Sequence, residues 1–203
     1  MGRIGSLLVR YEALAGGGYQ AALNGASFSA LQEHWGVEME CFASPLNCRF
    51  RRYCSAFPDT DVWFGSSGSF FEFSPSSGSF EANPPFVPSV VEAMTKHMQR
   101  LLSAAEERGD ALSFIVVIPT WQHTEGWRIL NEGQFLRHHL LLRQKEHSYC
   151  EGSQHKRWKQ AHRMSSCDTS VFWWQTSAAS SKWAVTETGL HALRHAFAST
   201  LSE

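Results

Sequence analysis

The chain has 203 residues, 43% hydrophobic and 18% charged, a composition that supports one domain with a sizeable core and excludes an intrinsically disordered protein. No apolar run approaches the roughly eighteen residues of a membrane span, and no cleavable signal peptide is expected, so no membrane partner is predicted. The five cysteines include no C-x-x-C pair, which favours a reduced intracellular protein without a zinc ribbon or a disulfide framework.

The net charge of −1 conceals an uneven distribution along the chain. Residues 137–164 carry seven Lys and Arg against two Glu, together with five of the ten histidines. Such a basic stretch is typical either of a phosphate-facing surface or of an ordinary solvated face. Basic side chains surround Trp158 within it, a pattern that suits RNA binding through charge and stacking; they are His155, Lys156, Arg157 and Lys159.

The first half of the chain predicts helices and short strands. Ser27 is expected to cap a helix that ends at Gly36, and residues 37–42 predict a short buried strand. A second helix is expected over residues 48–57. Residues 65–78, rich in Ser and Gly, predict a short strand or hairpin between loops.

The clearest unit begins at residue 79. Residues 79–82 predict a short extended run, and Pro88 opens a helix with apolar residues at helical spacing that ends at Gly109. Residues 112–118 are almost continuously apolar, as a parallel strand covered on both faces should be. Strand, helix and strand over this length form a βαβ unit, so the predicted fold class is α/β.

The remaining elements complete one domain. Residues 134–142 and 169–175 predict strands that flank the basic stretch, and residues 186–201 predict a closing helix. Residues 1–26 are expected to be an N-terminal extension of a core that spans residues 27–203.

Four residues between the predicted strand and helix carry the chemistry: Asn83, Pro84, Pro85 and Phe86. In an open α/β sheet, ligands bind outside the carboxyl ends of the strands, which is where these residues lie. The exocyclic amine of adenine is a poor nucleophile unless two acceptors hold its hydrogens and direct its lone pair. The side-chain oxygen of Asn83 and the carbonyl of Pro84 can be those acceptors, the prolines stiffen the loop, and Phe86 offers a face for base stacking.

The loop by itself leaves alternatives open. Asn-Pro-Pro is also compatible with a simple turn beside a hydrophobic residue. The same two acceptors would suit a glutamine amide nitrogen, so the motif alone does not separate adenine from a protein glutamine. The histidines at 138, 139 and 147 lack the spacing typical of a zinc site, so no metal is predicted.

Three longer segments closely resemble the phosphorylated-CTD-interacting-factor family, the cap-specific adenosine N6-methyltransferases. They read Glu-Cys-Phe-Ala-Ser-Pro-Leu-Asn-Cys, Arg-Tyr-Cys-Ser-Ala-Phe-Pro-Asp-Thr-Asp and Gly-Ser-Phe-Glu-Ala-Asn-Pro-Pro-Phe, at residues 40–48, 52–61 and 78–86. Shorter matches continue in the same order at residues 113–116, 118–119 and 152–155, and the resemblance covers roughly residues 35 to 185.

The resemblance implies a Rossmann-like core that uses S-adenosylmethionine to methylate N6 of the 2′-O-methyladenosine next to the cap of mRNA, in the nucleus. It assigns Asn83, Pro84, Pro85 and Phe86 to the target adenine, with Asn83 also close to the cofactor. It further suggests that the loop after the first strand contacts the donor; the loop comprises Ala43, Ser44, Pro45, Leu46 and Asn47. That loop is expected to precede a helix, and a plain turn with a helix cap at Asn47 is the alternative.

The family also suggests phosphorylated RNA polymerase II as a partner, through an amino-terminal WW module. None of the eight tryptophans forms a WW-like pair with the expected spacing, so the sequence does not support this partner. Two other functions remain as alternatives to the RNA methyltransferase. One is a methyltransferase for DNA adenine or protein glutamine, and the other is a non-catalytic RNA- or transcription-associated binding module.

Overall fold

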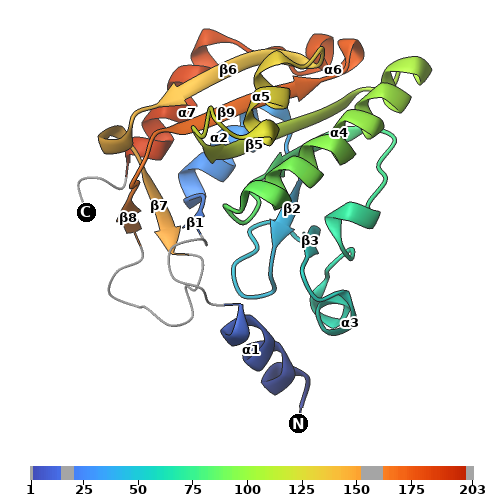
Figure 1. Cartoon of the computed structure of the whole chain (residues 1–203), viewed down its shortest axis with the longest axis vertical. Coiled ribbons are helices and arrows are strands. Elements are labelled where there is room, and N and C mark those ends of the chain that lie inside the picture. The colour runs from blue at the N-terminus through green and yellow to red at the C-terminus, as the bar shows by residue number, and fades with distance from the viewer. Residues whose placement is uncertain (1, 15–20, 152–161, 200–203) are drawn as a thin grey trace.

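The computed structural model describes residues 2–14, 21–151 and 162–199. Its centre is a six-stranded mixed sheet with the strand order β3-β2-β4-β5-β9-β6 (Figure 1). The strands are β2 (Met39–Ala43), β3 (Tyr53–Ser55), β4 (Gly78–Ala82), β5 (Leu112–Pro119), β6 (Leu136–Leu142) and β9 (Thr169–Gln175). The α/β fold class is therefore confirmed.

The first four strands of the sheet are parallel, whereas β9 runs antiparallel to both of its neighbours, β5 and β6. Along the chain, β2 is followed by β3 on one side and then by β4 on its other side. The direction of the connections therefore reverses next to β2. In doubly wound sheets such a reversal opens a crevice at the carboxyl ends of the strands, where ligands bind.

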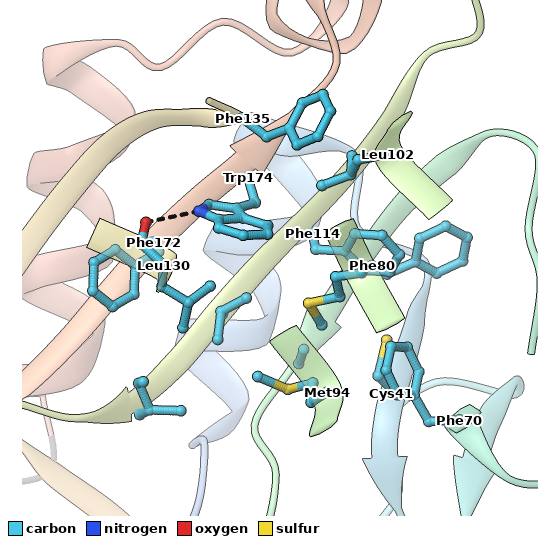
Figure 2. Close-up of a cluster of buried hydrophobic side chains, with 14 of the residues drawn as sticks. Cys41, Phe70, Phe80, Met94, Leu102, Phe114, Leu130, Phe135, Phe172 and Trp174 are labelled. Atoms are coloured by element: carbon cyan, nitrogen blue, oxygen red, sulfur yellow. Dashed lines mark hydrogen bonds between the residues drawn. The ribbon is translucent and has the colours of Figure 1, made fainter. Parts of the chain in front are cut away.

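Helices cover both faces of this sheet. Successive side chains of a strand point to opposite faces, and in the central strands both sets are apolar, so both faces need a cover. Phe114 and Val116 of β5 join a cluster with α4 (Pro88–Arg108) and α5 (Glu125–Glu132), which Figure 2 shows. Ile115 and Val117 point to the other face, where α2 (Gly25–Trp35) and α7 (Glu187–Ala198) pack. In the first cluster the indole N–H of Trp174 donates to the carbonyl of Leu130 at 2.8 Å, so this buried ring keeps its polar group satisfied (Figure 2).

The βαβ unit is confirmed as β4, α4 and β5. Pro88 occupies the first turn of α4, and Gly109 ends it in a left-handed conformation with φ of 73°. All eight residues of β5 are buried, and Leu112 to Val116 pair in parallel with β4, as the apolar run predicts. The strand over residues 169–175 is present with the predicted bounds, and the strand over residues 134–142 and the closing helix are present with shorter ones.

Three local predictions are wrong. Residues 48–57 form no helix; after an irregular stretch Tyr53–Ser55 make β3, since this short segment is buried on the parallel edge beside β2. Residues 65–78 contain a 3-10 helix, η2 (Phe70–Glu72), in place of the expected short strand or hairpin. The cap of α2 is Asn24, whose side chain accepts from the N–H of Ser27 at 2.7 Å.

A second, three-stranded sheet lies below β6 and β9 and to the left of β2 in Figure 1. In it β7 (Ser148–Glu151) pairs with both β1 (Ala21–Ala22) and β8 (His162–Met164). The N-terminal helix α1 (Arg3–Ala13) lies beside α3 (Pro58–Asp61), which precedes the 3-10 turn η1 (Val62–Phe64). The remaining elements are η3 (Gln144–Glu146) and α6 (Ser177–Lys182). The expected domain boundary after residue 26 stays a prediction.

Candidate functional site

A pocket of about 360 Å³ opens at the carboxyl ends of β2, β3 and β4, where the order of the sheet reverses. Its volume lies within the range of small-molecule sites. Its walls come from the loops after β2 and β4, from β1, from η2 and from the last turn of α1. The pocket therefore occupies the crevice that a doubly wound sheet offers to a ligand.

Asn83 lies directly after β4 and lines this pocket. Its side-chain nitrogen donates a hydrogen bond to the carbonyl oxygen of Ala21 in β1, at 2.5 Å. Because a carbonyl only accepts, this contact determines which end of the amide is nitrogen. The other end, Oδ1, is buried and has no hydrogen-bond partner among the described residues. Asn83 therefore keeps an unused acceptor in the wall of the pocket.

The rest of the Asn-Pro-Pro-Phe loop divides between the pocket and the core. Pro84 and Pro85 line the pocket, as the sequence predicts for a rigid loop around a ligand. Phe86 is 8% exposed and packs edge-on against Trp121 and Tyr149, with ring centroids 6.4 and 6.0 Å away. The ring of Phe86 is absent from the pocket lining, so its stacking on adenine stays a prediction.

The loop after β2 is a closed turn. Three of its five residues line the pocket: Ala43, Ser44 and Asn47. The side-chain oxygen of Asn47 accepts from the backbone N–H and the hydroxyl of Ser44, at 2.8 and 2.9 Å. The pocket lining does not include Pro45 or Leu46. No helix follows Asn47, so the helix-cap alternative is wrong; Asn47 instead shapes the loop itself.

Two acidic residues that the sequence reading did not single out lie in the same pocket. Glu40 and Glu81 are register partners on β2 and β4 and are 4% and 1% exposed. Burial raises the pKa of both carboxyl groups, and the charge of Glu40 raises the pKa of Glu81 further. A signal was available, since a Glu inside an apolar strand segment is rare unless it is paired.

Helix α1 closes one side of the pocket through Tyr11 and Leu14. The hydroxyl of Tyr11 donates to Oδ2 of the fully buried Asp61 at 2.5 Å, and its ring meets Phe57 edge-on. An exposed ion pair between Arg10 and Asp59 adds to the attachment. The sequence predicts this segment only as part of an N-terminal extension, and its place beside the pocket has no local signal.

The other predicted site residues lie away from the pocket. The basic cluster of His155, Lys156, Arg157 and Lys159 falls outside the described residues. Across the part of the chain that the structure describes, no group of His, Cys, Asp or Glu could hold a metal ion. No helix within that same part is both long and apolar enough to cross a membrane.

The fold and the pocket define an α/β protein with a cavity at the switch point of its sheet. Residues 1–152 match the family model described as "Phosphorylated CTD interacting factor 1 WW domain", and the chain belongs to this family. The described residues of the matched segment form α1 to α5 and most of the main sheet. The resemblance of the three sequence segments is thus confirmed.

Two curated relatives carry the name mRNA (2′-O-methyladenosine-N(6)-)-methyltransferase. The human protein is 44% identical over 204 residues, which cover 96% of this chain and 29% of the relative. The mouse protein is 42% identical, over 96% of this chain and 28% of the relative. The chain thus spans less than a third of the length of these relatives.

Proposed function

We propose that this chain is the Rossmann-like core of an S-adenosylmethionine-dependent N6-adenine methyltransferase that acts on mRNA. The names of the human and mouse relatives support the activity, and the parallel strands β3, β2, β4 and β5 with their crossover helix support the fold. The pocket at the switch point is where such a fold takes a nucleotide-like cofactor.

The observation that carries the proposal is the orientation of Asn83. Its nitrogen is held by Ala21, so its oxygen is left as an acceptor for one hydrogen of an exocyclic amine. Pro84 follows on the pocket wall, and its backbone carbonyl is the proposed acceptor for the second hydrogen. Two fixed acceptors would direct the amine lone pair, and such preorganised positioning can supply several kcal/mol of the barrier reduction, on the order of 7 or more for well-aligned groups.

The residues around the pocket fit S-adenosylmethionine, which would supply an electrophilic methyl group. The loop of Ala43, Ser44 and Asn47 would contact the donor, while Pro45 and Leu46 would support the turn. Oδ1 of Asn83 and Oε1 of Glu81 are buried without a hydrogen-bond partner among the described residues, and a ligand in this pocket could supply one. Buried polar atoms are rarely left without a partner in native proteins, so a polar ligand is the natural completion of the site.

The proposed substrate is the 2′-O-methyladenosine that follows the mRNA cap, in the nucleus, as the family resemblance implies. We further propose that His155, Lys156, Arg157 and Lys159 contact RNA phosphates or bases. The proposal does not include binding to the phosphorylated tail of RNA polymerase II. The segments that resemble a cap methyltransferase give no evidence for that partner.

Two measurements on the chain test the proposal. Isothermal titration with S-adenosylhomocysteine should show binding at one site. Methyl transfer from labelled donor should then occur on capped RNA that begins with 2′-O-methyladenosine, and not on matched RNA that begins with 2′-O-methylguanosine. Transfer to DNA adenine or to a glutamine peptide in place of RNA would favour the alternative enzymes. RNA binding without cofactor binding would favour a non-catalytic module.

A further inference from the structure

Glu40 and Glu81 form a pair of carboxyl groups on one side of the sheet. Their neighbours along each strand, such as Cys41 and Phe80, point into the cluster beneath α4. Since side chains alternate along a strand, the two glutamates project toward the opposite face, where both line the pocket. They are also Cα register partners, so the two side chains leave adjacent strands at the same level.

The two carboxyl groups differ in their hydrogen bonds to the described residues. Oε1 of Glu40 accepts hydrogen bonds from the backbone N–H groups of Arg49 and Phe50, at 2.7 and 3.0 Å. Oε1 of Glu81 is buried and meets no partner within the described parts of the chain. Glu40 is therefore held in position by the segment that precedes β3, whereas Glu81 has an unused oxygen beside the pocket.

The electrostatics of the pair differ between its members. Burial raises the pKa of Glu40, but the two backbone N–H groups and the charge of Arg49 oppose that rise. Burial also raises the pKa of Glu81, and the nearby Glu40 adds to the effect. The other ionisable groups that face Glu81 are the Cys41 thiol on β2 and the Tyr149 phenol on β7, both kept neutral by burial. Burial and the neighbouring Glu40 thus both favour the protonated form of Glu81, and no cation within the described ranges opposes them.

Glu81 also stands two residues before Asn83, at the same strand end. A methyl donor must bring its positively charged sulfur next to the amine that Asn83 would hold. We propose that Glu81, with Glu40 beside it, is a cation subsite for the sulfonium group, and so distinguishes the methyl donor from its neutral thioether product. This inference rests on the proposed function, because it assigns a ligand group to the same pocket.

The test compares two ligands that differ in this charge. Isothermal titration of the wild-type chain should show tighter binding of S-adenosylmethionine than of S-adenosylhomocysteine. In Glu81→Gln, which keeps the shape of the side chain, the affinity for S-adenosylmethionine should fall about tenfold while that for S-adenosylhomocysteine stays within about twofold. Glu38→Gln is the matched control, since Glu38 is an exposed carboxylate just before β2 that does not line the pocket.

A second measurement needs no variant and covers the case in which Glu81→Gln fails to fold. Titration of the wild-type chain in buffers of different ionisation enthalpy gives the number of protons released on binding. Binding of S-adenosylmethionine should release more protons than binding of S-adenosylhomocysteine, because a sulfonium favours the ionised form of Glu81. Equal proton release, or equal weakening of both ligands in Glu81→Gln, would overturn the sulfonium assignment. Failure of both ligands to bind the wild-type chain would instead overturn the proposed function, and this inference with it.

Discussion

The side-chain nitrogen of Asn83 donates to the carbonyl oxygen of Ala21, 62 positions earlier in the chain. Ala21 belongs to β1, which pairs with β7 in the small second sheet. A single hydrogen bond therefore connects the loop at the end of the main sheet with a strand from a different sheet. It also determines that the oxygen of Asn83, and not its nitrogen, is left without a partner among the described residues.

Substitution of Asn83 tests this arrangement. Asn83→Ala should lower kcat about a hundredfold, as loss of other preorganised polar contacts does, and should reduce stability by only about 1 kcal/mol through the lost bond to Ala21. Asn83→Asp keeps an acceptor but cannot donate to Ala21, so it should also lose most of its turnover. Steady-state kinetics on capped RNA, with circular dichroism of each variant, provides the measurement. Wild-type turnover in Asn83→Ala would show that the loop has another role.

Phe86 should behave as a core residue. It is buried against Trp121 and Tyr149, so Phe86→Ala should destabilise the fold by about 3–5 kcal/mol. Val62→Ala, at a position that is 55% exposed, is a control that should change the free energy of unfolding by less than about 0.5 kcal/mol. Urea denaturation measures both. If Phe86→Ala unfolds like wild type but raises KM for RNA, base stacking would be its main role.

Helix α1 should depend on one hydroxyl group. Tyr11→Phe keeps the edge contact with Phe57 but leaves the buried carboxyl group of Asp61 without its donor. Leaving this buried acceptor unsatisfied costs about 1–3 kcal/mol and should speed amide exchange in α1 by about ten- to a hundredfold. Amides of α4 serve as the internal control. Unchanged exchange in α1 would mean that other contacts hold the helix in place.

His147 should make the fold less stable in mild acid. It is fully buried; its Nδ1 lies 2.7 Å from the carbonyl of Arg143, so this nitrogen carries the proton, and its Nε2 lies 2.8 Å from the hydroxyl of Thr169. Burial lowers the pKa of His147, so the unfolded chain binds a proton more readily than the native state. The resulting stability is present above the unfolded pKa of about 6.5 and is lost as the pH falls below it.

The measurement is the free energy of unfolding of wild type and His147→Gln at pH 7.5 and 5.5. Between pH 7.5 and 5.5 the free energy of unfolding should fall more steeply for wild type than for His147→Gln. The difference in slope is at most about 1.4 kcal/mol per pH unit for one proton. His138 and His139, whose pKa values burial also lowers, remain in both proteins and cancel in the comparison. His123→Gln, an exposed control, should keep the wild-type pH dependence. Parallel curves for wild type and His147→Gln would contradict the prediction.

The basic cluster should control the salt dependence of RNA binding. Replacing Lys156, Arg157 and Lys159 with Ala should weaken binding and flatten the dependence of affinity on salt, because fewer counterions are released. Fluorescence titration at several salt concentrations gives the slope. A slope equal to that of wild type would mean that these residues form a solvated face.

Much of the central layer could be predicted from the sequence. The apolar residues of β5, the proline that opens α4 and the glycine that ends it are local signals, and each specifies its element without reference to the rest of the chain. The Asn-Pro-Pro-Phe loop could likewise be placed at a strand end, since it lies between two such elements. The family followed from motifs that are contiguous in the sequence.

Short elements were harder to predict because their local propensities are weak. The three residues of β3 form a strand only because β2 provides a parallel edge beside them. Asn24 takes the capping role expected of Ser27, because its side chain reaches the N–H of Ser27 while its own amide nitrogen donates to Ala196 in α7. The bond to Ala196 joins Asn24 to the far end of the chain, so the residues around Asn24 do not predict it.

The sequence by itself determined the α/β class, the βαβ unit and the family, because these depend on periodicity and on motifs that are read along the chain. Only the tertiary structure decided what surrounds Asn83. The bond from Asn83 to Ala21, the pairing of Glu40 with Glu81 and the contact of Tyr11 with Asp61 join residues that are 41 to 62 positions apart. Such contacts exist only after the strands have taken their order in the sheet, since that order, and not local propensity, brings distant side chains to one pocket.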